Sequence, residues 1–478
     1  MGNSRIHVPV SAIDTTWLGM DESTNPMIVN CIMFLSQRVD YQRLLETLDR
    51  RLIARYNRFS QRIVDGLPVV GNLQWESDPH FDIRSHVHHV ALPEPGGQAE
   101  LKQLVSMLMS EPLDRTRPLW RIYLISNLGD GCAVYGRIHH AIGDGLGLMQ
   151  VVLSLTDPEP SGPNARSEHA PAATSTPRSS GLVRSPLRLA ARAAATMVDA
   201  VSKRKADPLG ARQDVKDALG ALSLGGKIAA ATSLDLARLL LMPPDRVSPY
   251  RGKLTPIKRV AWSRPLPLER VKSVGKASGA TVNDVLTAAV SLGLRNYMTV
   301  VDRAVPHDDI RAAVPINLRQ NDAPPTLGNK FGFVFLTLPT SIADPLECLH
   351  ETKKRMQALK GSTEPQLIYE ILSLMGILPG AISRPLTAWF AAKVTCLLTN
   401  VPGPRRPVYF VGNRVDRMLF WVPQSRSVGL GISIFSYAGD VTIGIMVDDA
   451  LVPEPEHVVA NISSAFEAIE SAVGRQRS

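Results

Sequence analysis

The sequence predicts an α/β fold of two domains with antiparallel or mixed sheets, and three observations support this. At 478 residues the chain is longer than one ordinary domain. Strand-like and helix-like segments follow one another, and the late strands are joined by short turns. A Pro- and Ser-rich stretch over 157–186 contains no aromatic residue. We therefore expect an N-terminal domain over 1–156, a linker over 157–250 and a C-terminal domain over 251–478.

The N-terminal domain is expected to contain a hairpin just before its most unusual motif. Its expected strands cover 28–35, 120–126 and 132–138, and its expected helices cover 40–56 and 98–109. Apolar residues recur at every fourth position from Leu44 to Tyr56, which gives the first helix one apolar face. The turn sequence Asn-Leu-Gly-Asp-Gly over 127–131 predicts that the last two strands pair as a hairpin.

A basic helix is expected within the linker, over 187–205. Between 181 and 205 six residues are basic and one is acidic. Two interpretations remain open. The helix either packs on the body of the protein with a solvated face, or lies at an interface and is attracted to anionic lipid headgroups.

The C-terminal domain is expected to combine helices with a group of consecutive strands. The expected strands cover 258–263, 310–318, 330–338, 394–401, 407–411, 416–421, 428–436 and 441–447. The expected helices cover 281–297, 344–360, 365–377, 380–392 and 456–473. Short turns between the last strands indicate an antiparallel or mixed sheet rather than a purely parallel one.

Charge and cysteine content restrict the partners and the compartment. The chain has 53 basic and 44 acidic residues, a net charge of +9, which suits a lipid surface or a phosphate-bearing substrate. The four cysteines have no metal-type spacing, so we expect reduced thiols in a cytoplasmic protein. We find no secretory signal and no uncharged apolar run of about 18 residues. If the protein acts on lipid, we expect it to act from the surface.

Residues 138–145, Ile-His-His-Ala-Ile-Gly-Asp-Gly, are the main candidates for chemistry. They lie where an expected strand ends and a helix begins, a common place for an active site. The unperturbed pKa of an imidazole is about 6.5, so a neutral imidazole can accept a proton at cytosolic pH. If the strand reaches residue 140, His139 and His140 face opposite ways, and alternation alone does not say which one faces the site. Asp144 is well placed to cap the helix, and Gly145 allows close backbone approach.

Other reaction schemes have less support in the sequence. The stretch nearest to a Gly-x-Ser-x-Gly nucleophile elbow, 431–435, ends in Phe. Cys132 lies roughly 26 Å from His140 along the strand, at about 3.3 Å per residue, which is too far for a Cys–His pair. Neither a Walker A motif nor a dinucleotide fingerprint is present. An acyl-enzyme intermediate is therefore unsupported.

A second histidine cluster lies in an expected strand at 86–89. His86 and His88 share one face, which suits either a metal site or an exposed polar strand. No acidic residue or cysteine stands at a matching spacing, and the number of ligands decides whether a metal binds. We therefore expect no metal site here.

The motif His139-His140-x-x-x-Asp144-Gly145 resembles a known signature. It is the HHxxxDG signature of the acyltransferase superfamily that includes chloramphenicol acetyltransferase and the condensation domains of peptide synthetases. By itself this motif identifies the superfamily and no single family.

Further motifs narrow the resemblance to the bacterial wax ester synthase/diacylglycerol acyltransferase family. Pro118-Leu119-Trp120 is similar to the PLW motif of that family, and Asn283-Asp284 is similar to its ND motif. Further blocks that resemble the family lie at 11–14, 315–319, 327–329 and 400–404. The resemblance covers almost the whole chain outside 157–250. Gly143 and Ile28 depart from the family pattern, which leaves the substrate preference open.

The resemblance implies two α/β domains of the chloramphenicol acetyltransferase type, with the active site in a channel between them. His140 would deprotonate an alcohol, and the alkoxide would attack the thioester carbonyl of acyl-CoA. His140 would then return the proton to the departing CoA thiolate, so that neither a metal nor a cofactor is needed. His139, Asp144 and Gly145 would support the motif.

The other two motifs are expected to support the channel. Pro118, Leu119 and Trp120 would do so from the N-terminal domain, and Asn283 and Asp284 from the C-terminal domain. Asn283 is a candidate for contact with the oxyanion of the tetrahedral intermediate, and a helix-capping amide is the alternative.

The expected function is that of an acyl-CoA-dependent O-acyltransferase that forms triacylglycerol from diacylglycerol, with wax ester formation from a long-chain alcohol as a second activity. We expect a cytoplasmic protein at the inner membrane face or on lipid inclusions, with no nucleic acid partner. Two alternatives remain open. One is a condensation-type or polyketide-associated acyltransferase that takes its donor from a carrier protein. The other is a lipid-binding protein of this fold without turnover.

Overall fold

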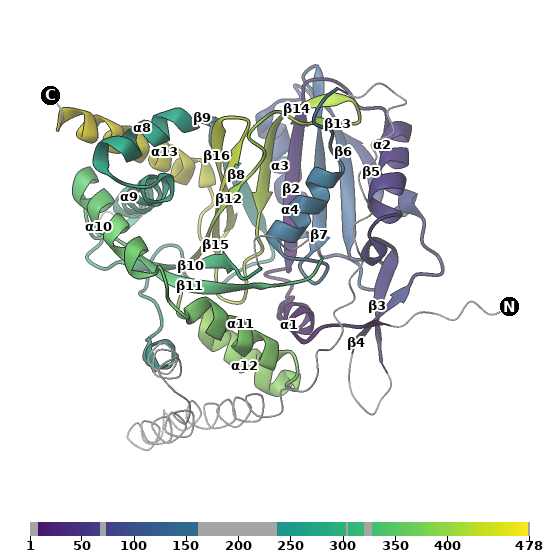
Figure 1. Ribbon diagram of the computed structural model, residues 1–478, viewed down its shortest axis with the longest axis horizontal. Coiled ribbons are helices and arrows are strands. Elements are labelled where there is room, and N and C mark those ends of the chain that lie inside the picture. Colours follow the sequence, from purple (N-terminus) through teal and green to yellow (C-terminus); the bar gives the residue numbers. More distant parts are fainter. Residues whose placement is uncertain (1–7, 67–72, 161–236, 303–304, 320–326, 477–478) are drawn as a thin grey trace.

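The computed structural model describes residues 8–66, 73–160, 237–302, 305–319 and 327–476. The basic helix expected over 187–205 and most of the expected linker lie outside these residues, so both stay predictions. In the described residues the strands form two large sheets and one small sheet, and helices cover the large sheets (Figure 1).

The sheet that carries the histidine motif is mostly antiparallel. In spatial order its strands are β13 (Tyr409–Phe410), β14 (Asn413–Trp421), β2 (Ile28–Leu35), β7 (Gly131–His139), β6 (Trp120–Leu128) and β5 (Val87–Ala91). β6 and β7 form the predicted hairpin, while β5 runs parallel to β6. β2 and β7 are buried along their whole lengths, which explains their nearly continuous apolar sequences.

The second large sheet is mixed. Its strands are, in spatial order, β11 (Phe331–Leu338), β10 (Ile310–Asn317), β12 (Cys396–Pro402), β15 (Leu430–Tyr437), β16 (Asp440–Asp448) and β8 (Lys258–Trp262), with β9 (Leu266–Pro267) beside β16. β12 runs parallel to both β10 and β15, and the other pairs are antiparallel. A small sheet of β1 (Val8–Pro9), β4 (Leu73–Ser77) and β3 (Gln61–Asp65) was not predicted.

The helices agree with most of the predicted ranges. They are α1 (Ala12–Met20), α2 (Tyr41–Leu48), α3 (Gln98–Ser110), α4 (Gly145–Ser154), α8 (Leu268–Ser278), α9 (Val282–Asp302), α10 (Pro345–Ala358), α11 (Glu364–Met375), α12 (Gly380–Ala391) and α13 (Pro455–Arg475). Short helical turns are η1 (Asp49–Ile53), η2 (Asn57–Ser60) and η3 (Ile83–Ser85). Helices α1 and α8 were not predicted.

The expected single helix over 40–56 is wrong in its second half. The α-helical part ends at Leu48, and the chain continues as the wider π-helical turn η1. Arg51 in this turn is buried, donates to the Leu155 carbonyl at 2.9 Å and pairs with Asp157 at 3.0 Å. The repeat of apolar residues does not reveal this buried cation, because its partner Leu155 lies 104 residues further along the sequence.

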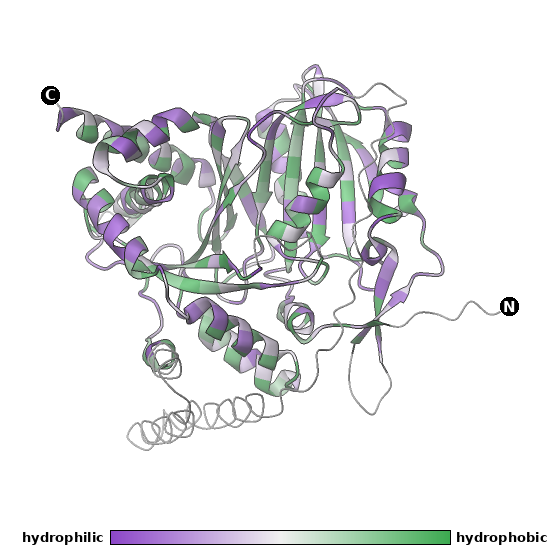
Figure 2. Cartoon of the chain, in the orientation of Figure 1, coloured by the Kyte–Doolittle hydropathy of each residue, from purple (hydrophilic) through white to green (hydrophobic). Residues whose placement is uncertain are grey.

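The two halves of the chain share one sheet and one core. β14 belongs to the C-terminal half, yet it pairs with β2 of the N-terminal half, with Trp421 opposite Asn30. A buried cluster joins Tyr135 of β7 with Trp262 of β8 and Met446 of β16. Figure 2 shows apolar residues along the strands of both large sheets. The expected domain limits at 156 and 250 stay a prediction.

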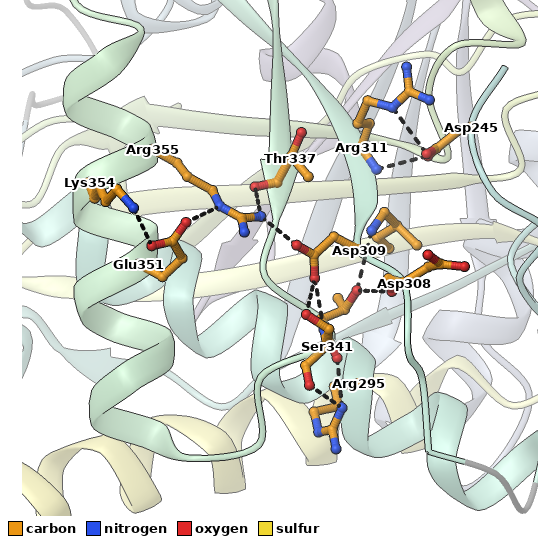
Figure 3. A network of polar contacts seen from close by, with 12 residues as sticks. Asp245, Arg295, Asp308, Asp309, Arg311, Thr337, Ser341, Glu351, Lys354 and Arg355 are labelled. Carbon is orange, nitrogen blue, oxygen red and sulfur yellow. Dashed lines mark hydrogen bonds and ion pairs between the residues drawn. The ribbon is translucent and has the colours of Figure 1, made fainter. Parts of the chain in front are cut away.

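A network of polar contacts holds α10 against β10 and β11 (Figure 3). Arg355 Nη1 donates to Asp309 Oδ2 at 2.8 Å and to the Thr337 carbonyl at 3.1 Å, while its Nε donates to Glu351 at 2.8 Å. Asp309 Oδ1 accepts from the backbone N–H and the hydroxyl of Ser341, at 2.8 and 2.6 Å. These contacts fix the start of β10, whose other end leads toward the histidine motif.

Among the described helices, none combines the length and the apolar character that crossing a bilayer requires.

A buried ion pair joins β8 and β16. Lys258 Nζ lies 3.0 Å from Asp448 Oδ2, and the two side chains are 2% and 0% exposed. Asp448 also accepts from the backbone N–H groups of Thr255 at 2.9 Å and Ala450 at 3.1 Å. The carboxylate is therefore fully paired, and removal of the cation would leave a buried charge without its counter-charge.

We expect Lys258→Met to lower the free energy of unfolding by about 3–5 kcal/mol, because Asp448 would remain buried and unpaired. Urea unfolding at pH 7, followed by circular dichroism, measures this loss. Adding Asp448→Asn to Lys258→Met should recover part of it, since the amide carries no charge. A double variant that is less stable than Lys258→Met would contradict this account.

Candidate active site

The chain leaves the β-sheet at the histidine pair. β7 ends at His139, so the alternation of a strand does not extend to His140. The His139 N–H donates to the Leu119 carbonyl at 2.9 Å, and the His140 N–H donates to the Met27 carbonyl at 2.8 Å. These two backbone hydrogen bonds fix the histidine pair between β6 and the segment that precedes β2.

The His140 ring packs against two aromatic rings, which also stack on each other at 5.5 Å. Its centroid lies 4.6 Å from that of Trp17 in α1 and 5.5 Å from that of Phe331 in β11. The residue is 5% exposed, and its Nδ1 atom is buried. Burial lowers the pKa of His140 from 6.5 to about 4, although the charge of Asp144 opposes this. The imidazole is therefore neutral at neutral pH, which a general base requires.

Asp144 uses both of its carboxylate oxygens in structural contacts. It is the N-cap of α4, and Oδ1 accepts from the Gly147 N–H at 2.8 Å. Oδ2 accepts from the Lys330 N–H at 3.0 Å and lies 2.5 Å from Nη1 of Arg319. Because Arg319 and Lys330 belong to the C-terminal half, this carboxylate joins the two halves at the motif. These contacts fit the supporting position expected for Asp144.

Gly145 is the first residue of α4 and lies on the wall of a cavity. A Cβ atom at this position would come no closer than 3.9 Å to its nearest neighbour, Val422 Cγ1. The sequence predicted that another group packs closely against Gly145, but no backbone atom of the protein does so. A side chain here would instead project beside the cavity.

His139 faces away from His140, toward an acidic residue. Its Nδ1 accepts from the Ala141 N–H at 3.1 Å, and its Nε2 lies 3.6 Å from Asp21 Oδ2. Asp21 also accepts from Arg115 and from the Met27 N–H, both at 2.9 Å. Burial would raise the pKa of Asp21, but His139 and Arg115 outweigh it and lower this pKa to about 2. His139 thereby braces the segment that holds His140.

Two further polar residues hold the motif from outside it. Asn329 Nδ2 donates to the His140 carbonyl at 2.8 Å and to Asp14 Oδ1 at 2.7 Å. Burial raises the pKa of Asp14, against the lowering effect of its hydrogen bonds. Sequence reasoning did not name Asn329 or Asp14 as site residues. Their positions in the family-like blocks at 327–329 and 11–14 were the available signal.

A cavity of about 510 Å³ opens beside His140. Both halves of the chain line it, and most of the lining side chains are apolar. Representative lining residues are Trp17, Met20, Met27 and Leu146 from the N-terminal half, and Phe331, Phe333, Ile368, Leu372, Phe390, Leu397 and Val428 from the C-terminal half. Asp144, Asn317, Arg319 and Asn400 add polar groups to the wall. The cavity suits a long apolar chain whose polar end lies near the imidazole.

Pro118, Leu119 and Trp120 support the motif from the side away from this cavity. The Leu119 carbonyl accepts from His139, and Trp120 Nε1 donates to the Phe59 carbonyl at 2.7 Å. Pro118 and Trp120 line a separate, more polar cavity of about 230 Å³. None of the three lies on the wall of the cavity beside His140.

Asn283 and Asp284 lie at the start of α9. Asp284 is buried and forms a reciprocal cap with Thr281, each accepting from the other's backbone N–H, at 2.8 and 3.2 Å. Asn283 is exposed, and its side-chain oxygen accepts from Asn400 Nδ2 at 2.7 Å. Asn400, not Asn283, lies on the cavity wall. The motif thus reaches the cavity through one intervening side chain.

The histidines at 86–89 engage in packing. His86 Nδ1 lies 2.9 Å from the Trp120 carbonyl, and its ring stacks on the Trp120 ring at 4.6 Å. His88 packs on Tyr123 at 5.3 Å. Within the described ranges, no group of three or more His, Cys, Asp or Glu side chains is arranged to hold a metal.

The models of two domains of one protein family match the sequence. The wax ester synthase/diacylglycerol acyltransferase catalytic domain matches residues 10–286, and the WS/DGAT C-terminal domain matches residues 327–470. A similar protein of Mycobacterium tuberculosis strain H37Rv is named "Probable diacyglycerol O-acyltransferase tgs1"; it is 29% identical over 91% of this chain and 88% of its own length. A second from that strain, named "Probable diacyglycerol O-acyltransferase tgs2", is 28% identical over 85% of both chains.

Solved structures support the predicted fold class. The wax ester synthase/diacylglycerol acyltransferase from Marinobacter aquaeolei VT8 is similar with a TM-score of 0.67 and 22% identity, over 98% of this chain and 100% of that one. The first condensation domain of the calcium-dependent antibiotic synthetase is similar with a TM-score of 0.62 and 15% identity, over 99% and 97%. The fold of two chloramphenicol acetyltransferase-like domains is therefore confirmed. Because the catalytic-domain match alone spans more than half of the sequence, this chain belongs to the wax ester synthase/diacylglycerol acyltransferase family.

Proposed function

We propose that the protein is an O-acyltransferase that transfers a fatty acyl group from acyl-CoA to diacylglycerol and forms triacylglycerol. Long-chain alcohols are a second class of acceptor, and their products are wax esters. The observation that carries the proposal is the neutral, buried imidazole of His140 at the wall of a large apolar cavity built by both halves. The names of the family and of the M. tuberculosis relatives point to the same reaction.

The proposed reaction needs one acid–base group. Because Nδ1 of His140 is buried, Nε2 is the nitrogen that meets the acceptor hydroxyl. As Nε2 takes the proton, the alkoxide oxygen attacks the thioester carbonyl and forms a tetrahedral intermediate. When this collapses, the C–S bond breaks, the ester is released, and the imidazolium returns the proton to the CoA thiolate. Since a thiol has a pKa of about 8.5, thiolate leaves without a metal.

Surroundings of His140 support this cycle. The imidazole charges transiently when it holds the proton, and Asp144 is the nearby negative charge that favours that form. Asn329 fixes the backbone of His140, so that the ring stays aimed at the cavity. The apolar walls exclude water, which would otherwise compete with the alcohol for the thioester.

The location of the protein follows from its substrates. Diacylglycerol, long-chain alcohols and their esters reside in lipid, so we propose peripheral association with the inner membrane face or with lipid inclusions. The net charge of +9 suits an anionic lipid surface and the phosphates of CoA. Condensation domains share the fold. A carrier-protein donor is therefore the alternative that the assays below also test.

We expect His140→Ala to lower kcat with oleoyl-CoA and diacylglycerol by roughly a hundredfold or more, the usual scale for a general base. Release of CoA, measured with a thiol reagent, and labelled triacylglycerol, separated by chromatography, report the activity. His89→Ala is the matched control, because His89 is exposed and stacks on Tyr41 outside the cavity. Equal CoA release by wild type and His140→Ala would refute the role of His140. Turnover only with a carrier-bound donor would favour the alternative.

The pH profile should reflect the low pKa of His140. The base is active when neutral, and with a pKa of about 4 it remains neutral across the weakly acidic range. We expect kcat/KM to stay level from pH 7.5 down to about pH 5.5 and to fall only below that. Return of samples to pH 7.5 before assay controls for unfolding. A loss of activity centred near pH 6.5 would show that the imidazole is not desolvated in the free enzyme.

We expect Asp144→Asn to move this acid limb to still lower pH. The substitution removes the negative charge that raises the pKa of His140, while asparagine still caps α4. Asp284→Asn is the matched control, because it alters a helix-capping carboxylate whose partner is Thr281. The limb should stay in place in Asp284→Asn. An unchanged or higher limb in Asp144→Asn would contradict the electrostatic role.

A further inference from the structure

Helices α11 and α12 form a hairpin at one edge of the molecule, outside β11 (Figure 1). From residue 371 to 393, the last part of α11, the tip at 376–379 and all of α12, the sequence holds two charged residues, Arg384 and Lys393. Both are basic. A surface helix normally presents a charged face to water, so this composition is unusual for an edge.

The inner side of the hairpin is part of the cavity wall. Ile368 and Leu372 of α11 line the cavity beside His140, as do Phe390 and Ala391 of α12. The hairpin is fastened to α1, since Thr16 Oγ1 donates to the Leu372 carbonyl at 2.7 Å. It therefore separates the cavity from the outside by one layer of helix.

The outer side carries apolar residues and one exposed cation. Ile377 at the tip is 63% exposed. On α12, Ala381, Arg384, Pro385 and Ala388 are exposed. Trp389 is half-buried, and Lys393, whose Nζ lies 3.7 Å from the centre of that ring, is buried and contributes no charge to this surface. An exposed aliphatic tip, a half-buried tryptophan and an exposed arginine are typical of elements that lie at the level of lipid headgroups.

We propose that this outer side, defined by Ile377, Ala381, Arg384, Pro385 and Ala388 and called the docking face, binds an anionic lipid surface. Diacylglycerol then enters the cavity along the hairpin. The proposal rests on the proposed function, because an acceptor dissolved in lipid must reach His140 without crossing water. The charge of Arg384 matches anionic headgroups, and the acidic residues of the hairpin, Glu364 and Glu370, belong to the earlier part of α11.

A second exposed apolar group is a natural comparison. Val300, Val301 and Val305 are 71%, 49% and 51% exposed and lie at and just beyond the end of α9. None of them lines the cavity beside His140. If exposed apolar residues alone determined lipid binding, this group would serve as well as the docking face.

Co-sedimentation of the full-length protein with vesicles of equimolar phosphatidylcholine and phosphatidylglycerol tests the proposal. We expect Ile377→Asp to weaken binding by about tenfold, because it places a charge where an aliphatic side chain would enter the lipid. Arg384→Gln should weaken binding to these vesicles and have little effect with pure phosphatidylcholine. Val300→Asp is the matched control and should bind like wild type. Unchanged binding by Ile377→Asp, or an equal loss in Val300→Asp, would overturn the proposal.

Activity with two acceptors separates docking from catalysis. With a water-soluble short-chain diacylglycerol, Ile377→Asp should retain wild-type kcat/KM within about twofold, whereas with dioleoylglycerol in vesicles it should lose about tenfold, in line with its binding. Equal losses with both acceptors would overturn the docking role. Ile377→Ser, which adds no charge, provides a milder variant whose loss should be intermediate. If wild type transfers no acyl group to either acceptor, the proposed function fails, while the vesicle-binding result still decides the docking face.

Discussion

The contact of Asp144 with Arg319 and the Lys330 N–H is the interaction on which the site depends. The cavity has walls from both halves, so it exists in its working form when those halves are held in register. Asp144 provides this link, and it follows His140 closely in the sequence. Asn329 provides a second link, through the His140 carbonyl and Asp14. The carboxylates of Asp144 and Asp14 thus help to hold in place the segment that carries His140.

The surroundings of His140 balance two opposing demands. Burial against Trp17 and Phe331 keeps the imidazole neutral, as the proposed reaction requires, yet it also makes the imidazole a weaker base. The nearby charge of Asp144 offsets part of that loss and favours the protonated form that arises during the reaction. In the proposed reaction, these surroundings would serve both the neutral and the protonated imidazole.

Much of the architecture could be predicted because it is local. The strand over 28–35, the hairpin before His139 and the late strands follow from apolar runs and turn residues. For the candidate site, the sequence singled out residues by their motifs and could not show the contacts between those motifs. The hydrogen bond from Asn329 to Asp14 spans 315 residues of sequence, and only the family-like blocks at 327–329 and 11–14 marked the two residues. Likewise, no periodicity separates Asn400, which lines the cavity, from Asn283, which lies behind it.

The pairing of β14 with β2 has a consequence for synthesis of the chain. β2 and β7 are made early, but one edge of β2 has no partner until residues 413–421 leave the ribosome. An apolar strand edge without a partner can pair with another chain and promote aggregation. The sheet that carries the histidine motif can therefore be completed only late in synthesis. For the same reason, a fragment that ends before residue 409 lacks β13 and β14 and has an incomplete sheet.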